Sequence, residues 1–263
     1  MHDFVMKIPP KNSTRGRNPR TPVDKFQTLA WYNYILDVRG PCTSYHLEQT
    51  IREKDLKTGE ELFVSRRLWD EYKTGTVSPS ADFLPNGKPG AVLLAESHVP
   101  MSAEIYRHLL WRVMRTPFMR MSEAVEALET FKREISNHYF DPTESDIRKK
   151  CISLDQNLWM PVTVKLGDCY AAMDHLAVNL MFLRLDVWSF SFNMKEIALN
   201  IANTLESVSF SPWIGPFHVE MYDWCEANIW KDMFDTHYEL GNPSVLVWRK
   251  INPAWERIPR SDA

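Results

Sequence analysis

Titratable side chains fall in a row on a helix predicted over residues 168–186. At about 100° per residue, Asp168, His175, Asn179 and Asp186 lie on nearly one line along that helix. Such a row of carboxylates with an imidazole could bind a metal ion or transfer protons. Asp168 and Asp186 would be about five turns apart, roughly 27 Å, so one metal ion cannot bind both. The alternative is the solvent-facing side of an apolar helix, with a hydrogen bond between His175 and Asn179.

A histidine and a cysteine offer a second arrangement for catalysis, in a helix predicted over residues 217–235. His218 and Cys225 are seven residues apart and can share one face of that helix. A nucleophilic cysteine needs a base and a group that orients the base, and the sequence places no such third group. A core cysteine and a boundary histidine are the alternative. The chain has no HExxH, GxGxxG, P-loop or GxSxG motif, so we predict no catalytic residue, no metal site and no cofactor.

Basic residues gather in two stretches of the chain. Residues 107–120 contain four arginines, of which Arg112 and Arg115 are three apart and share a helix face. Residues 248–260 combine basic residues with two tryptophans and could stack the bases of a single strand. Residues 220–239 are acidic instead. Separate basic and acidic surfaces suit a protein that docks a nucleic acid and another protein, and they also suit a self-assembling protein.

One short stretch indicates a class of partner. Residues 64–79 read VSRRLWDEYKTGTVSP, in which Ser65 is expected to cap a short helix that reaches Thr74. Gly75 suits the C′ position after that helix. The side chains predicted to pack inward are Leu68, Trp69 and Tyr72. Those predicted to stay exposed are Arg66, Arg67, Asp70 and Lys73.

The spacing of this stretch is similar to the second half of a helix-turn-helix of the lambda-repressor/Cro family. The spacing is kept by Val64-Ser65, Trp69, Tyr72, Gly75 and Pro79. The resemblance implies a recognition helix whose first turn faces a phosphate or a base edge, with Arg66 and Arg67 placed for guanine or phosphate contacts. It also implies that residues 58–62 begin the family's other helix, although they leave about one turn too few residues before Val64. The alternative is a capped surface helix with an aromatic inner face.

These observations predict a non-enzymatic nucleic-acid-binding subunit, with DNA favoured over RNA. The candidate contacts are Ser65, Arg66, Arg67, Lys73, Arg112 and Arg115. A protein partner or a homo-oligomer is also expected, within a multi-protein prokaryotic or phage assembly. Two alternatives stay open. One is a protein-interaction or scaffolding subunit without nucleic-acid contact, and the other is a hydrolase-like enzyme that uses His175 or His218.

The N-terminal part of the chain is predicted to be an arm followed by a helical portion. Residues 1–24 form a basic, flexible arm, and residues 25–100 form the N-terminal portion. A helix is expected from Lys25 to Val38, ended by Gly40-Pro41, and Thr43 or Ser44 caps a second one. Polar residues 54–59 break the pattern, and four prolines make residues 75–101 a loop-rich boundary.

Residues 101–263 are predicted to form a larger helical portion. Ser102 is expected to cap a helix whose apolar stripe is Ile105, Leu109 and Val113. Short strands are expected at residues 158–166 and 244–251 and could pair with each other. Further helices are expected from about Ser122, at Asp141-Pro142 and at residues 194–207.

Composition favours helices and a reducing compartment. In 263 residues, 44% are hydrophobic and only 9 are glycine, so we predict a mainly α, multi-helix globular protein with at most a small β-ribbon. The most apolar window, residues 169–192, contains Asp174 and Arg184, which are costly in lipid, so no membrane span is expected. The four cysteines form no CxxC pair, which favours a cytoplasmic setting.

Overall fold

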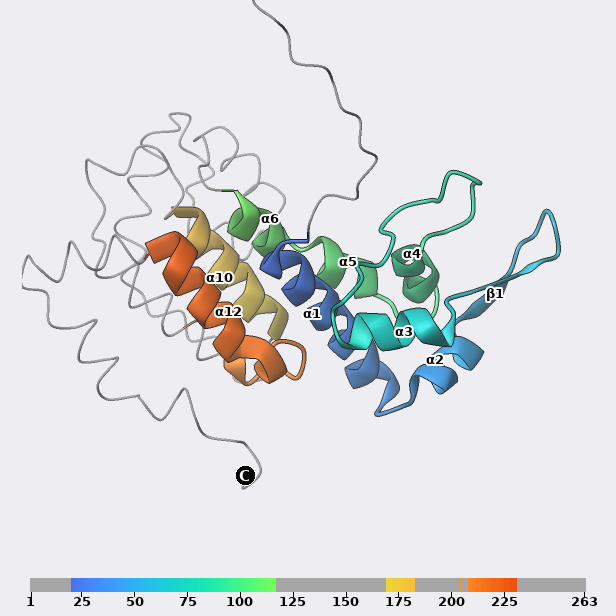
Figure 1. Ribbon diagram of the computed structural model, residues 1–263, viewed down its shortest axis with the longest axis horizontal. Coiled ribbons are helices and arrows are strands. Elements are labelled where there is room, and N and C mark those ends of the chain that lie inside the picture. Colours follow the sequence, from blue (N-terminus) through green and yellow to red (C-terminus); the bar gives the residue numbers. More distant parts are fainter. Residues whose placement is uncertain (1–19, 117–168, 183–203, 205–207, 231–263) are drawn as a thin grey trace, which may run out of the picture.

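Helix α1 (Pro22–Arg39) packs against four of the other described helices (Figure 1). The computed structural model describes residues 20–116, 169–182, 204 and 208–230. In these residues α1 is followed by α2 (Ser44–Thr50), β1 (Arg52–Lys54), β2 (Glu61–Phe63), α3 (Arg66–Lys73), α4 (Ala91–Glu96), α5 (Ser102–Arg107), α6 (Leu109–Arg115), α10 (Cys169–Phe182), a 3₁₀ turn (Gly215–Phe217), α12 (His218–Cys225) and a π-helical turn (Glu226–Trp230). The predicted fold class, mainly α with one small β-ribbon, is confirmed.

The N-terminus of α1 is fixed by a capping box. The amide of Asp24 donates to the Thr21 hydroxyl at 3.3 Å, and the Asp24 carboxylate accepts from the Thr21 amide at 2.8 Å. Pro22 occupies the first helical position. These three residues start the helix before the predicted Lys25, and Gly40 ends it as predicted, with φ 82°. Of the predicted arm, residues 1–19 lie outside the described residues.

Stacked aromatic rings join α1 to α3 and α5. The ring of Trp31 stacks on that of Trp69, with centroids 5.7 Å apart, and meets Tyr72 and Tyr106 edge-on at 5.5 and 6.1 Å. All four side chains are buried. Because Trp69 and Tyr72 are on α3, this cluster explains why the aromatic face of α3 points inward, as the sequence predicts.

The β-ribbon lies where no strand is predicted. Strands β1 and β2 pair antiparallel, with Arg52 opposite Phe63 and Lys54 opposite Glu61. The polar break at residues 54–59 is the turn of this hairpin, in which the Asp55 carboxylate accepts from the amides of Lys57 and Thr58. Residues 58–62, expected to begin a helix, therefore belong to the turn and to β2, and that expectation is wrong. The predicted strands at 158–166 and 244–251 lie outside the described residues.

One predicted helix is divided in two, and its predicted cap is wrong. His108 has ψ 140° and separates α5 from α6, within the stripe Ile105, Leu109 and Val113. Ser102 is the first residue of α5 rather than its cap. The carboxylate of Glu96, the last residue of α4, instead accepts from the amides of Met101 and Ala103 at 2.9 and 2.6 Å.

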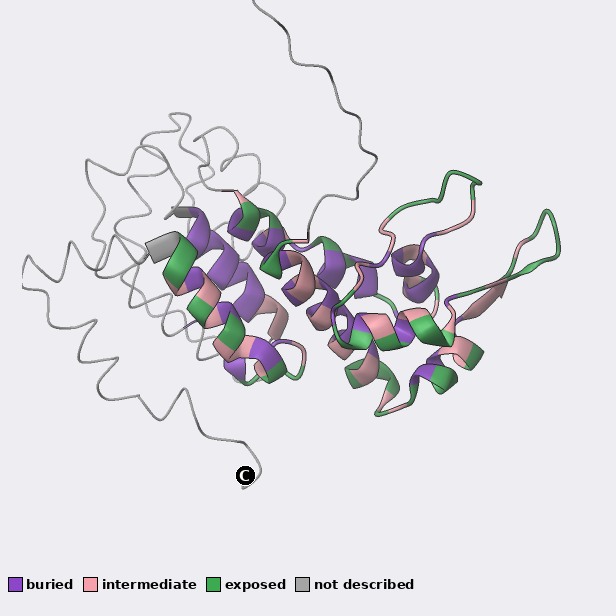
Figure 2. Cartoon of the chain, in the orientation of Figure 1, coloured by how far each residue is buried: buried purple, intermediate pink, exposed green. Residues whose placement is uncertain are grey.

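The buried residues form one continuous cluster across the predicted boundary at residues 75–101. Helix α1, from the N-terminal portion, contacts α5 and α6 as well as α3. In Figure 2 the buried surfaces of α1, α5, α6 and α10 adjoin one another. Helix α10 is apolar on nearly every side, and residues 172–181 are all buried. The helices predicted from Ser122, at Asp141-Pro142 and at residues 194–207 lie outside the described residues, apart from residue 204.

We expect Trp31→Ala to lower the free energy of unfolding by about 3–5 kcal/mol, because it leaves a void between α1, α3 and α5. Urea unfolding followed by far-UV circular dichroism measures this loss. Tyr45→Ala is the matched control, since the Tyr45 side chain is 57% exposed, and its effect should stay within about 0.5 kcal/mol. Equal losses in the two variants would contradict a central role for Trp31.

The pKa of Asp24 predicts how the capping box responds to acid. Burial raises this pKa, but hydrogen bonds from the Thr21 amide and hydroxyl and from Arg115 outweigh burial, and the pKa falls below its ordinary 3.8. Because the folded pKa is the lower one, ionised Asp24 stabilises the fold above about pH 4, and this contribution is lost as the pH falls through the folded pKa.

Asp24→Asn should therefore cost about 1 kcal/mol at pH 7, and less at pH 3. Urea titrations at the two pH values measure the difference. Asp223 is an exposed carboxylate on α12, and Asp223→Asn should change the free energy of unfolding little at either pH. A cost of Asp24→Asn that is the same at pH 3 as at pH 7 would contradict the role of the ionised carboxylate.

Candidate nucleic-acid interface

Helix α3 presents a basic outer face above a buried aromatic one. Its Trp69 and Tyr72 side chains are buried, whereas the side chains of Arg66 and Arg67 are 67% and 88% exposed. Lys73 is exposed in the last turn. The arrangement follows from the helical period: Trp69 and Tyr72 are three residues apart and share one side, whereas Arg67 lies about 200° around the helix from Trp69. Four of the six predicted contacts, Ser65, Arg66, Arg67 and Lys73, thus belong to this helix and its N-cap.

Ser65 stands at the N-cap position of α3 but does not cap the helix with its side chain. Its backbone is extended (φ −62°, ψ 148°), and its hydroxyl accepts no hydrogen bond from the first turn. Its carbonyl accepts from the amide of Trp69 at 3.1 Å, as the first bond of the helix. Ser65 is therefore the N-cap residue, as predicted, but it lacks the expected side-chain hydrogen bond, and no side chain among the described residues caps the amides at this end of α3.

Each exposed arginine of α3 faces a carboxylate one turn further along. Arg66 Nε lies 4.0 Å from Asp70 Oδ2, and Arg67 Nε lies 3.2 Å from Glu71 Oε1. Pairs of this kind on a helix surface contribute only about 0.3–0.5 kcal/mol and are screened by salt. A phosphate group, which binds arginine with two hydrogen bonds, can therefore displace them.

Gly75 ends α3 in the left-handed conformation that the sequence predicts. Its φ is 65°, its amide donates to the Tyr72 carbonyl at 3.0 Å, and the Thr76 amide donates to the Glu71 carbonyl at 2.9 Å. The Arg20 guanidinium donates to the Gly75 carbonyl. A Cβ atom at this position would lie 2.8 Å from Lys25 Cγ on α1. Glycine therefore allows α1 and the end of α3 to approach closely.

The structure does not place Arg112 and Arg115 beside the basic face of α3. Both are on α6, and Arg115 binds the Asp24 carboxylate at 2.7 Å and the Gln27 side chain, joining α6 to the start of α1. Arg112 instead lines a cavity between α4, α5, α6 and α10. The predicted interface therefore reduces to the face of α3.

The residues considered for catalysis are buried or held by the backbone. His175 and Asn179 are buried, so the expectation that this row faces solvent is wrong. The Asn179 side-chain amide, through Nδ2, donates to the His175 backbone carbonyl at 2.9 Å, so this bond does not use the His175 imidazole. His218 Nδ1 lies 2.6 Å from the Gly215 carbonyl oxygen, and Cys225 is fully buried. Asp168 and Asp186 lie outside the described residues.

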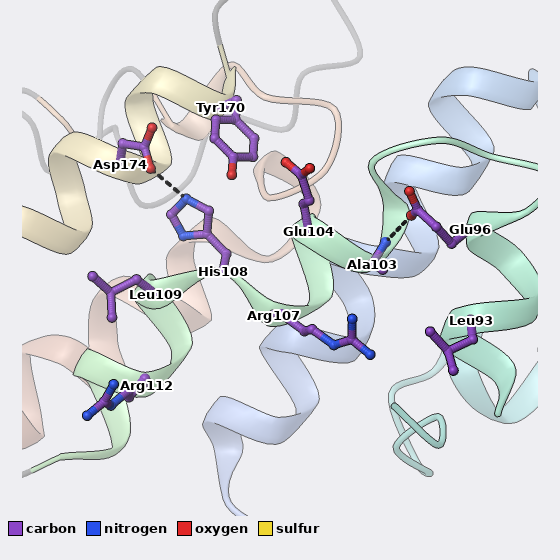
Figure 3. Close-up of a pocket in the computed structure, with 10 residues that line it drawn as sticks. All are labelled: Leu93, Glu96, Ala103, Glu104, Arg107, His108, Leu109, Arg112, Tyr170 and Asp174. Atoms are coloured by element: carbon purple, nitrogen blue, oxygen red, sulfur yellow. Dashed lines mark hydrogen bonds and ion pairs between the residues drawn. The ribbon is translucent and has the colours of Figure 1, made fainter. Parts of the chain in front are cut away.

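A buried pair that the sequence analysis missed joins α6 to α10. His108 Nε2 lies 3.0 Å from Asp174 Oδ1 (Figure 3). His108 Nδ1 accepts from the Leu110 backbone amide at 3.1 Å. Because Nδ1 accepts, Nε2 carries the proton, and the imidazole is neutral. Both ring nitrogens are engaged, so His108 is not placed to act as a general base. No sequence pattern links these residues, which are 66 positions apart.

Comparison with known proteins found no matching family model, no matching curated protein and no matching solved structure. Within the described ranges, no three histidine, cysteine or acidic side chains are grouped to hold a metal ion. Among those same residues, no helix has the length and apolar character needed to cross a membrane. The geometry of α3 and of the cavities is therefore the basis for any functional inference.

Gly75→Ala should destabilise the protein by about 1–2 kcal/mol more than Gly87→Ala does, because only Gly75 is crowded by α1. Both glycines have positive φ, 65° and 78°, but no atom lies within 4 Å of a Cβ built on Gly87. The control, Gly87→Ala, therefore measures only the cost of placing alanine at a positive φ. Thermal and urea unfolding of the two variants give the comparison, and equal losses would show that Lys25 moves aside at no cost.

Proposed function

We propose that this protein is a non-enzymatic nucleic-acid-binding subunit, and that the N-terminal turn of α3 contacts the phosphate backbone. The observation that carries the proposal is the combination of an uncapped helix N-terminus with two exposed arginines in the same turn. Backbone amides at such an end attract anions, and the arginines supply charge and hydrogen bonds. Ser65 adds a hydroxyl that the helix itself does not use.

The way α3 is anchored supports this role. Its aromatic face is held by Trp31 of α1, so the outer face has a fixed orientation. The β1–β2 hairpin projects beyond the N-terminal end of α3 (Figure 1). The hairpin contains Lys54 and Lys57, together with acidic residues that balance their charge. Affinity would therefore depend on the first turn of α3 rather than on a broad basic surface.

DNA is the favoured nucleic acid because an α-helix fits the major groove of B-form DNA, whereas that of A-form RNA is too narrow. We also propose a cytoplasmic location. Cys42, Cys169 and Cys225 are all free thiols, which agrees with a reducing compartment.

The proposal is tested by fluorescence anisotropy of labelled duplex DNA, single-stranded DNA and RNA, titrated with the protein across a salt series. Duplex DNA should bind best, and Arg66→Ala/Arg67→Ala should weaken it and reduce the slope of log K against log salt by about 1–2. Asp70→Asn should strengthen binding, because it removes the carboxylate that faces Arg66.

Arg39→Ala is the control, an exposed arginine on α1 outside the proposed interface. If Arg39→Ala weakens binding as much as Arg66→Ala/Arg67→Ala does, the contact is non-specific and α3 is not the interface. Absence of binding to all three nucleic acids at low salt would overturn the proposal.

A protein-interaction subunit is the second candidate, and exposed apolar side chains favour it. Leu56 at the hairpin turn is fully exposed, and Phe83 in the loop before α4 is 69% exposed. The hairpin and this loop are linked by an ion pair between Lys88 and Glu60. A protein partner or a second copy of the chain could bind both elements together. The burial of His175 and the backbone contact of His218 give no support to a hydrolase.

A further inference from the structure

A cavity of about 710 Å³ lies between α4, α5, α6 and α10 (Figure 3), and α3 contributes no residue to its lining. Its volume is in the range that accommodates small molecules. The wall formed by α5, α6 and α10 carries the polar groups Glu104, His108, Tyr170 and Asp174. Leu93 and Leu109 supply apolar surface. The cavity is therefore amphipathic, with its polar groups gathered on one wall.

Asp174 brings an uncompensated negative charge to this wall. Its side chain is only 4% exposed, and its one partner among the described residues is His108, bound through Oδ1. Because His108 is the neutral tautomer, it satisfies a hydrogen bond without neutralising the carboxylate. The second oxygen, Oδ2, has no hydrogen-bond donor in the described part of the chain. A buried carboxylate without a cationic partner is costly, and a bound cation would remove that cost.

A second carboxylate lies on the same wall. Glu104 on α5 faces the cavity beside the Tyr170 ring (Figure 3) and has no ion-pair partner among the described residues. The Tyr170 ring packs edge-on against His108, with centroids 5.2 Å apart. Burial, with the charges of Asp174 and Glu104, raises the pKa of Tyr170 to about 12. This shift agrees with a negative potential at the wall.

The other charged side chains of the cavity do not neutralise these carboxylates. Arg107 donates to the Ala81 carbonyl at 2.7 Å and to Asp82 at 3.1 Å, so its guanidinium is directed to the loop before α4. Glu96 caps α5. In Figure 3, Arg112 lies beyond Leu109, and its guanidinium is directed away from Asp174. The negative wall is therefore open to a ligand.

We propose that this cavity binds a small organic ligand through a protonated primary amine, which lies against Asp174 and Glu104. The aliphatic part of the ligand packs against Leu93 and Leu109. An ammonium group suits the site because it is compact, positively charged and has three hydrogen-bond donors. Two kinds of ligand carry such a group. One is an alkyl amine or diamine, and the other is an amino acid whose carboxylate binds Arg112 at the other side of the cavity.

Isothermal titration calorimetry of the full chain with four five-carbon probes tests the proposal: pentylamine, 1,5-diaminopentane, 5-aminopentanoate and pentanoate. The three amines should bind, and pentanoate should not. Tightest binding of 5-aminopentanoate indicates an amino acid, and tightest binding of the diamine or monoamine indicates an alkyl amine. Binding of pentanoate as tight as that of the amines, or no amine binding at millimolar concentration, would overturn the proposal.

Two variants test the wall itself. Glu104→Gln changes an exposed side chain, so folding is preserved, and Asp174→Asn keeps an oxygen that can accept from His108. Each should weaken amine binding about tenfold or more, which is the effect of losing one favourable charge contact of about 1.4 kcal/mol. Asp223→Asn on α12 is the control and should bind like the parent chain. Unchanged affinity in Glu104→Gln would place any amine site elsewhere.

Discussion

The stacking of Trp31 on Trp69 is the contact on which the described structure depends, because it joins α1 to α3 and, through Tyr106, to α5. It forms despite a cost, since the indole N–H groups of Trp31 and Trp69 are buried without an acceptor among the described residues. Each unmet donor costs about 1–3 kcal/mol. Burying the apolar surface of one tryptophan contributes roughly 4–6 kcal/mol, so packing outweighs the lost hydrogen bonds.

Features set by nearby residues could be predicted from the sequence. The amphipathic face of α3, the cap of α2 by Thr43 and the turn at Gly75 each depend on side chains within one or two helical turns. The hairpin was missed because its strands are three residues long, too short to show an alternating pattern.

Features set by tertiary contacts could not be predicted. His175 and Asn179 have a spacing typical of a solvent-facing row, but both are buried, on a helix that packs against α6. His108, at the break between α5 and α6, binds Asp174, 66 positions away in the sequence. In each case the spacing of neighbouring residues does not reveal the tertiary contact. For the same reason the sequence does not indicate the cavity beside Asp174.

Glu96 has a consequence for how the structure opens. It ends α4, and its carboxylate holds the first amides of α5, so one side chain serves both helices. If the last turn of α4 unwinds, α5 loses its cap at the same moment. The two helices are thereby made one cooperative unit of local unfolding, although each is only six residues long. Hydrogen exchange at the amides of Met101 and Ala103 would then report on the integrity of α4 rather than of α5 alone.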